Sequence, residues 1–230
     1  ERGESVNPVV AETHWLRSGS MAELYKNMQQ RGEPVVNTAE IIKLEKGRPG
    51  EAFARCAEVI KTGGVIAYPT DTFYGLGADP RNPRAVSKVF EIKGRGADQP
   101  ILLLLHDRSE VTAWTSSVTP SAERLMDRFW PGPLTLVFTA RPDVFPELTG
   151  RTGTIGLRVP GNEVTRALLG RAGNALTGTS ANRSGSSSPR TPDEVMRELG
   201  GRVDLVLDGG VLPADRPSTV VDVTAEPPRI

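Results

Sequence analysis

The 230-residue chain has one cysteine and two histidines, and these shortages exclude several kinds of site. Cys56 alone forms no intramolecular disulfide and no cysteine metal cage. His14 and His106 lie far apart in the sequence, which argues against a histidine zinc site and against a Ser-His-Asp triad. We therefore expect no metal ion that is bound by protein side chains.

An excess of one charge and a long apolar run are also absent. The 28 basic and 28 acidic residues give a formal net charge of zero, which argues against a general coat for nucleic acids or membranes. No apolar run approaches the roughly 20 residues of a membrane span. The first residues lack the apolar segment of a secretory signal, and we expect a cytoplasmic protein. Residues 81–108 nevertheless hold six basic and three acidic residues, so the zero net charge does not exclude a local basic groove.

The two common phosphate-binding fingerprints, Gly-x-x-x-x-Gly-Lys-Ser/Thr and Gly-x-Gly-x-x-Gly, do not occur.

The length of the chain suits one sizeable domain with a full core. Residues 1–37 show little periodicity, and we expect an N-terminal extension there that is partly disordered or docks on another surface. Residues 38–230 are expected to form the domain that carries the function.

Helical and strand patterns alternate after residue 50, which predicts a single α/β domain with a twisted mixed sheet and flanking helices. Asn82 and Pro83 predict a helix start, as N-cap and first-turn proline. Expected helices cover about 52–62, 82–94, 119–130 and 162–170, and one more starts at 191. Expected strands cover 65–68, 101–105, 134–138, 154–159, about 174–179, about 203–207 and about 218–223, with an edge strand within 38–50.

The segment 64–77 is the most informative part of the sequence. An apolar run over residues 65–68 ends at Pro69, which predicts a buried strand. Gly75 and Gly77 leave the backbone free to turn sharply. Polar groups follow the strand at four positions, Thr70, Asp71, Thr72 and Tyr74. The segment therefore predicts a strand that delivers polar groups to the rim of a pocket.

Three further segments are candidates for the same pocket. Lys93 and Arg95 flank Gly94 where a helix should end, so they either complement the helix dipole or bind anionic oxygens. Residues 177–182 carry three hydroxyls and an amide, and they form either a substrate-binding segment or an ordinary Ser/Thr turn. Thr154 and Arg158 share one strand face, and Arg158 needs an anionic partner, either a ligand or an internal carboxylate.

Six motifs follow one another along the chain: Pro69-Thr70-Asp71-Thr72-Phe73-Tyr74-Gly75-Leu76, Lys93-Gly94-Arg95, Trp130-Pro131-Gly132-Pro133-Leu134-Thr135, Gly156-Leu157-Arg158-Val159-Pro160, Thr179-Ser180-Ala181-Asn182 with Ser184-Gly185, and Pro217-Ser218-Thr219-Val220-Val221-Asp222. Together they resemble the YrdC-like threonylcarbamoyl-AMP synthases, of the single-domain type, over about residues 50–230. The chain departs from the family pattern at Gly96, Gln99 and Leu104, where proline, asparagine and histidine are frequent. Relatives also continue past position 230 through another basic residue that contacts ATP.

The resemblance implies a YrdC-like fold with a basic concave substrate surface. It implies a nucleotidyltransferase that converts L-threonine, bicarbonate or CO2, and ATP into threonylcarbamoyl-adenylate and pyrophosphate, with Mg2+ carried on the ATP phosphates. A partner protein would then pass the threonylcarbamoyl group to adenosine 37 of tRNA.

The resemblance also implies roles for individual residues. Lys93, Arg95, Ser180 and Asn182 match the family's catalytic tetrad. Thr70 or Thr72 would hold threonine, together with Tyr74, Arg158, Thr179 and Ser218. Arg95, Gln99, Thr154, Ala181 and Ser188 would contact ATP.

Two other functions remain open at this stage. The basic concavity of relatives suggests a double-stranded-RNA-binding module without catalysis, although the zero net charge counts against it. A carbamoyl-adenylate-forming relative, as in hydrogenase-maturation proteins, is the second. Those proteins normally carry zinc-finger-like segments, which a single cysteine cannot build.

Overall fold

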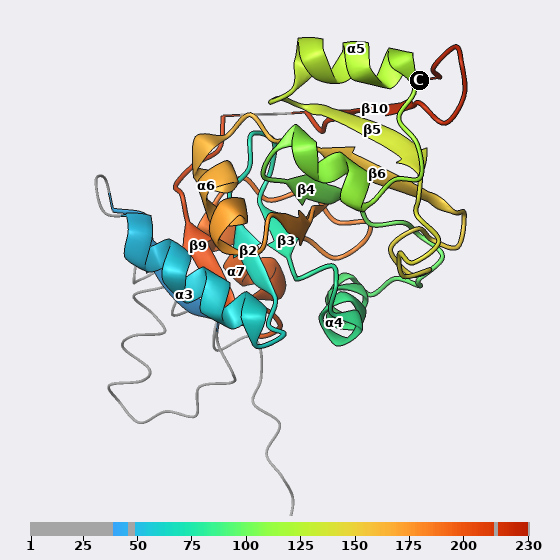
Figure 1. The fold of residues 1–230 in the computed structure, drawn as a ribbon. Helices are drawn as coiled ribbons and strands as arrows, with labels where there is room; N and C mark the ends of the chain where they lie inside the picture. Colours follow the sequence, from blue (N-terminus) through green and yellow to red (C-terminus); the bar gives the residue numbers. More distant parts are fainter. Residues whose placement is uncertain (1–38, 46–48, 214–215, 230) are drawn as a thin grey trace, which may run out of the picture.

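A computed structural model describes residues 39–45, 49–213 and 216–229 (Figure 1). The expected extension over residues 1–37 lies outside the described residues. The helices are α3 (Pro49–Lys61), α4 (Pro83–Lys93), the 3-10 helix η1 (Arg108–Ala113), α5 (Pro120–Phe129), α6 (Glu163–Arg171) and α7 (Pro192–Leu199). The strands are β1 (Glu40–Lys43), β2 (Ile66–Tyr68), β3 (Gly75–Gly77), β4 (Leu103–Leu105), β5 (Leu134–Thr139), β6 (Thr154–Arg158), β7 (Ala175–Thr177), β8 (Thr179–Ser180), β9 (Leu205–Asp208) and β10 (Thr219–Asp222).

The strands form two five-stranded sheets, with the orders β1-β9-β2-β3-β8 and β10-β5-β6-β4-β7. Each sheet contains parallel and antiparallel pairs: β2 runs parallel to β9 and antiparallel to β3, and β4 runs parallel to β6 and antiparallel to β7. The expected α/β class with mixed strands and flanking helices is confirmed, and the strands form two sheets where the sequence predicted one. The expected edge strand is β1, which among the described strands pairs with β9 alone.

Local capping explains where several helices begin. The Asn82 side chain accepts hydrogen bonds from two backbone N–H groups at the start of α4, and Pro83 occupies the first turn, as the sequence predicts. Thr191 and Glu194 form a reciprocal capping box at α7.

In the described part of the chain, no helix has the length and apolar character that crossing a membrane requires.

Alternating side chains of the central strands divide between two hydrophobic cores. Ile66 and Tyr68 of β2 enter the smaller core, which also holds apolar residues of α3 and α6, whereas Ala67 enters the larger core. The central strand β9 divides in the same way, with Val206 in the larger core and its two leucine neighbours in the smaller one. This is the period-two pattern of a strand that is buried on both faces.

The two sheets meet at Gly178, which separates β7 from β8. The expected strand over about 174–179 is therefore interrupted, and its two parts pair in different sheets. A Cβ atom on Gly178 would lie 2.5 Å from Leu102 Cδ1 and 2.8 Å from Leu104 Cγ, so only glycine lets the chain cross there without moving its neighbours.

Residues 75–77 correct one expectation. They form strand β3 instead of a sharp turn, and they pair with both β2 and β8. A Cβ on Gly77 would lie 2.7 Å from Tyr68 Cε1, and Tyr68 is fully buried. The glycine here is needed for a close approach of the backbone to an aromatic ring, which the sequence alone does not distinguish from a turn.

The Gly77→Ala substitution should therefore lower the free energy of unfolding by about 1–3 kcal/mol, because the added methyl group displaces the Tyr68 ring. Gly50→Ala is the matched control. It lies in the first turn of α3 with no atom within 4 Å of the position that a methyl group would take, and it should not lower the free energy of unfolding. Urea unfolding measures both, and equal stabilities for Gly77→Ala and the unchanged protein would contradict the close contact.

Candidate functional site

A cavity of about 290 Å3 lies where the two sheets meet. Its size is close to the lower limit for small-molecule sites, about 300 Å3. The lining comes from five separate segments: Thr70, Thr72, Phe73, Tyr74 and Gly75; Arg95, Pro100, Leu102 and Leu104; Arg158; Gly178, Thr179, Ser180 and Ser188; and Pro217 and Ser218. The segments that the sequence singled out therefore converge on one cavity.

The hydroxyls of Thr70 and Thr72 lie 3.0 Å apart at the cavity wall. Thr70 Oγ1 donates to the Phe73 carbonyl at 2.7 Å and accepts the Thr72 backbone N–H at 3.0 Å. With the Thr72 hydroxyl as its second donor, Thr70 Oγ1 has no hydrogen-bonding capacity left. Thr72 Oγ1 keeps one lone pair beyond its contact with Arg158, so it is the better acceptor for a ligand ammonium or hydroxyl group.

Arg158 is 3% exposed and borders the cavity. Its Nε donates to the Gly132 carbonyl at 3.1 Å, and its Nη2 forms an ion pair with Asp71 Oδ1. Asp71 Oδ2 accepts the Gly161 backbone N–H at 2.9 Å. The sequence predicted either a ligand or an internal carboxylate as the anionic partner of Arg158. In the structure the partner is the carboxylate of Asp71, and Arg158 still lines the cavity.

Lys93 lies in the last turn of α4, but its ammonium points into the protein. The residue is 3% exposed, and Nζ donates to the Ser180 carbonyl at 2.8 Å and to Asn182 Oδ1 at 3.3 Å. Asn182 Nδ2 donates to the carbonyl groups of Arg183 and Ser186, which orients the amide oxygen toward Lys93. Burial, together with repulsion from Arg95, lowers the pKa of Lys93 to about 8.

Arg95 is half-buried and borders the cavity directly. Nη2 donates to the Pro100 carbonyl at 3.2 Å, and the guanidinium carbon lies 5.8 Å from the centroid of the Phe90 ring. Its buried Nε has no hydrogen-bond partner among the described residues. Burial lowers the pKa of Arg95, and Asp98 partly offsets the effect. A guanidinium at a cavity wall favours an anionic ligand.

Four other expected residues also reach the cavity: Thr179, Ser180, Ser188 and Ser218. Ser218 Oγ lies 2.9 Å from Thr135 Oγ1. Thr135, from the 130–135 motif, therefore contacts a residue that lines the cavity but does not line it itself. The hydroxyl of Tyr74 is already bonded to the backbone, because it donates to the Gly210 carbonyl and accepts the Gly209 N–H.

Three of the expected ATP-binding residues do not line the cavity. Gln99 is exposed. Thr154 lies four residues from Arg158 along β6, about 13 Å of strand, and bonds to Thr152 Oγ1 at 2.8 Å. Ala181 is fully buried, with its N–H bonded to the Tyr74 carbonyl. Lys93 and Asn182 do not line the cavity either, but each is hydrogen-bonded to Ser180, which does: Lys93 Nζ and the Asn182 backbone N–H both donate to the Ser180 carbonyl.

The sequence missed the apolar side of the cavity and the partner of Arg158. Pro100, Leu102 and Leu104 form much of that side. Their apolar run predicted a buried strand, and no pattern in it indicates that one end borders a ligand site. Asp71 was recognised as a polar group at the rim, but its pairing with Arg158 bridges 87 positions of sequence.

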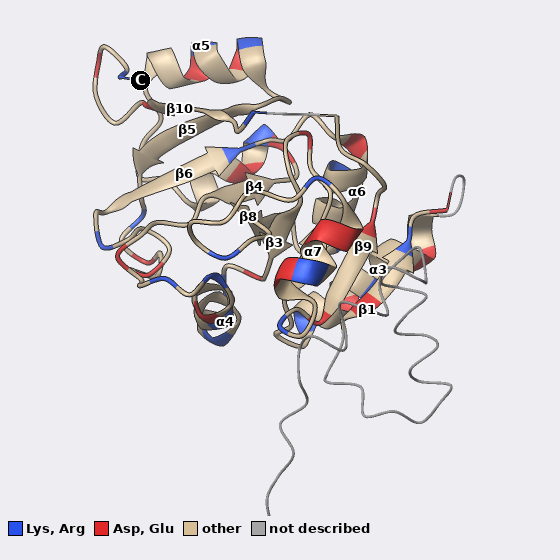
Figure 2. Cartoon of the chain, turned by 180° about the vertical axis from the view of Figure 1, so that it is seen from behind, with Lys and Arg blue, Asp and Glu red and all other residues tan. Residues whose placement is uncertain are grey.

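Basic and acidic positions are interspersed over the ribbon, and α7 carries both signs (Figure 2). Within residues 39–45, 49–213 and 216–229, no three His, Cys, Asp or Glu side chains gather closely enough to hold a metal ion.

Comparison with known proteins gives consistent matches. The Sua5/YciO/YrdC family model, which is described as "Telomere recombination", matches residues 58–230. Threonylcarbamoyl-AMP synthase of Bacillus subtilis is 36% identical over 76% of this chain and 51% of its own length. The enzyme of the same name from Thiobacillus denitrificans is 40% identical over 71% of this chain and 87% of its own length.

The crystal structure of P. abyssi Sua5 complexed with L-threonine superposes with a TM-score of 0.79 at 34% identity, covering 82% of this chain and 55% of that protein. The chain thus spans about half the length of the B. subtilis and P. abyssi relatives. The matched residues include every segment that lines the cavity. The chain therefore belongs to the Sua5/YciO/YrdC family.

Proposed function

We propose that the protein is a threonylcarbamoyl-AMP synthase, which converts L-threonine, bicarbonate or CO2, and ATP into threonylcarbamoyl-adenylate and pyrophosphate. The observation that carries the proposal is the convergence of Arg158, Arg95 and the Lys93-bonded Ser180 on one cavity. The site holds cations for the carboxylate of threonine and for the phosphates of ATP. The relatives that bear this activity in their names, and the relative with bound L-threonine, support the same assignment.

The amino acid would occupy the end of the cavity near Arg158. Thr72 Oγ1 has a free lone pair for an ammonium or hydroxyl group, and Arg158 retains donors beyond those given to Gly132 and Asp71. Asp71 fixes the guanidinium while neutralising part of its charge. We assign threonine binding to Thr72, Arg158, Thr179 and Ser218, with Thr70 and Tyr74 holding the wall in shape.

ATP would place its phosphates near Arg95 and Lys93. Arg95 offers a planar fork at the cavity wall, and Lys93 offers a point charge held in place by Ser180 and Asn182. Ser188 borders the same cavity. Gln99, Thr154 and Ala181 stay candidates for contacts with the nucleoside, which would lie outside the cavity. Mg2+ prefers water and phosphate oxygens, so ATP would bring its own ion.

The reaction needs no activated side-chain nucleophile. Carboxylation of the threonine amine gives a carbamate, and a carbamate oxygen then attacks the α-phosphorus of ATP. The bond from that phosphorus to the bridging oxygen breaks, and pyrophosphate leaves with the electron pair. The protein would orient the two substrates, which contributes up to roughly 7–11 kcal/mol of barrier lowering, and would neutralise the charge that moves to pyrophosphate.

The product would be passed on in a further step. Threonylcarbamoyl-adenylate is a mixed anhydride, and a separate transferase protein acting on adenosine 37 of tRNA would consume it. The family resemblance is the basis on which we propose this partner, a direct contact with RNA and a cytoplasmic location.

The first test is the substrate requirement. The protein is incubated with ATP, labelled L-threonine and bicarbonate, and the product is identified by its mass. Formation of pyrophosphate should depend on both L-threonine and bicarbonate. Equal turnover with L-serine, or without bicarbonate, would indicate a different adenylating reaction, and no ATP consumption combined with salt-sensitive RNA binding would favour an RNA-binding module.

The second test removes the two cations. Lys93→Ala and Arg95→Ala should each lower the rate of adenylate formation at least about tenfold, because the leaving pyrophosphate loses a charge-assisted contact. Lys61→Ala, at an exposed lysine in the last turn of α3, should keep the unchanged rate. Circular dichroism verifies the fold, and near-normal rates in either site variant would rule out its assigned role.

The third test uses the lowered pKa of Lys93. In the free protein its ammonium form predominates only below about pH 8, so kcat/KM for ATP should fall as the pH rises through that value. Lys93→Arg should lose this decline, because arginine stays charged. Unfolding does not explain the decline, since the unfolded chain binds the proton more tightly and this group therefore adds stability as the pH rises from about 8 toward 10.5. A pH profile that is flat between pH 7 and about 9 would contradict this role for Lys93.

A further inference from the structure

Arg183 brings a third cation to the Lys93–Arg95 segment. It directly follows Asn182, and its exposed side chain reaches over Gly94, the single residue between the two site cations. A Cβ atom on Gly94 would lie 3.4 Å from Arg183 Nη2 and 3.9 Å from Arg183 Nε. The guanidinium therefore lies against the backbone that carries both Lys93 and Arg95.

The Arg183 guanidinium is unpaired within the described residues. No carboxylate lies within ion-pair distance of it, and it donates no side-chain hydrogen bond there. Arg158, by contrast, is paired with Asp71. Glu198 and Asp98 act on Lys93 and Arg95 from beyond ion-pair distance, and none of the three neighbouring cations forms an ion pair within the described residues. Such a cluster is typical of a site that binds a polyanion.

The backbone of Arg183 is held in place from both sides. Its N–H donates to Glu198 Oε1 at 3.0 Å, and its carbonyl accepts Asn182 Nδ2 at 2.9 Å. The next residue, Ser184, donates its N–H to the Lys93 carbonyl at 2.9 Å. Glu198 lies in the last turn of α7, where the helix dipole disfavours a carboxylate, so its bond to Arg183 compensates an otherwise unfavourable position. The main chain is thus fixed while the guanidinium is left exposed.

We propose that Arg183 is a third phosphate-binding residue, which contacts the terminal phosphates of bound ATP and the pyrophosphate that leaves. This inference rests on the proposed function. Lys93 is buried and Arg95 is half-buried at the cavity wall, whereas Arg183 is exposed. The order of exposure places Arg183 at the outer end of the phosphate chain, farthest from the α-phosphorus.

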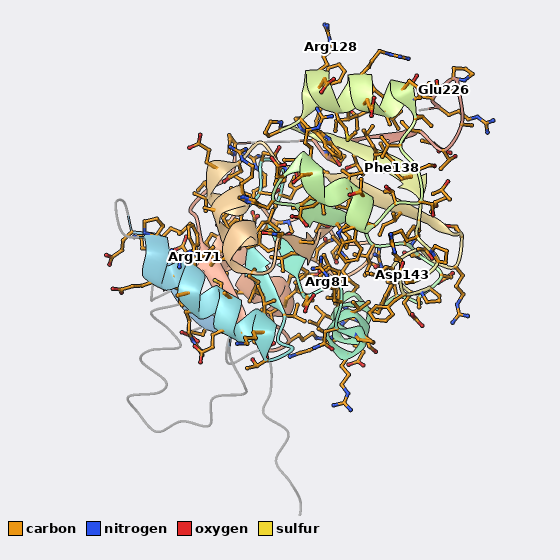
Figure 3. The ribbon with its side chains drawn as sticks, viewed as in Figure 1. Arg81, Arg128, Phe138, Asp143, Arg171 and Glu226 are labelled. Carbon is orange, nitrogen blue, oxygen red and sulfur yellow. The ribbon has the colours of Figure 1, made fainter. Side chains whose placement is uncertain are left out.

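Pyrophosphate is the probe that isolates this contact, because its binding requires neither threonine nor turnover. Calorimetric titration should show that Arg183→Ala weakens pyrophosphate binding about five- to tenfold at low salt, with a smaller effect at high salt, because exposed charges are screened. Arg183→Lys should retain most of the affinity. Arg128→Ala is the matched control: this exposed arginine projects from α5, at the end of the molecule away from α4 (Figures 1 and 3).

Steady-state kinetics provide the second measurement. Arg183→Ala should raise KM for ATP by a similar factor and leave KM for L-threonine unchanged. Pyrophosphate affinity equal to that of the unchanged protein, or an equal rise in both KM values, would overturn the inference. A lack of adenylate formation by the unchanged protein would refute the proposed function instead, and the pyrophosphate titration would still decide whether Arg183 binds phosphates.

Discussion

The crossing of the backbone at Gly178 is the constraint on which the candidate site depends. It sends β7 into one sheet and β8 into the other, and it is possible only because Leu102 and Leu104 lie against a residue without a side chain. The crossing brings the segment after β2, the end of β6 and the 179–182 segment to one place. A cavity at the junction of two sheets, rather than at the end of one, follows from that connection.

The charges of Arg158 and Lys93 are balanced in different ways. Arg158 is paired with Asp71, so its charge is largely neutralised within the protein. Among the described residues, Lys93 is bonded only to uncharged oxygens of Ser180 and Asn182, and burial lowers its pKa. An unpaired buried cation is costly in a protein without a ligand. The difference suits an amino acid beside Arg158, recognised by fixed donors, and a polyphosphate beside Lys93, whose charge offsets that cost.

The parts of this structure that sequence reasoning predicts are those fixed by local chemistry. Asn82 and Pro83 set the start of α4, and the run 101–105 contains a strand that is buried on both faces. The division into two sheets, the strand β3 and the Asp71–Arg158 pair depend on contacts between residues distant in sequence, which local patterns do not encode. For the site, motif spacing indicates which segments meet, but not that Thr70 is saturated by its neighbours or that Gln99 and Thr154 lie away from the cavity.

A crystal structure of the protein with L-threonine and a non-hydrolysable ATP analogue tests the shared cavity most directly. We expect the threonine carboxylate or hydroxyl group within hydrogen-bond distance of Arg158 and Thr72, and the phosphates within hydrogen-bond distance of Arg95 and Lys93, in one continuous site. Ligands bound in separate places, or phosphates that contact neither Arg95 nor Lys93, would contradict a single site built at the junction of the two sheets.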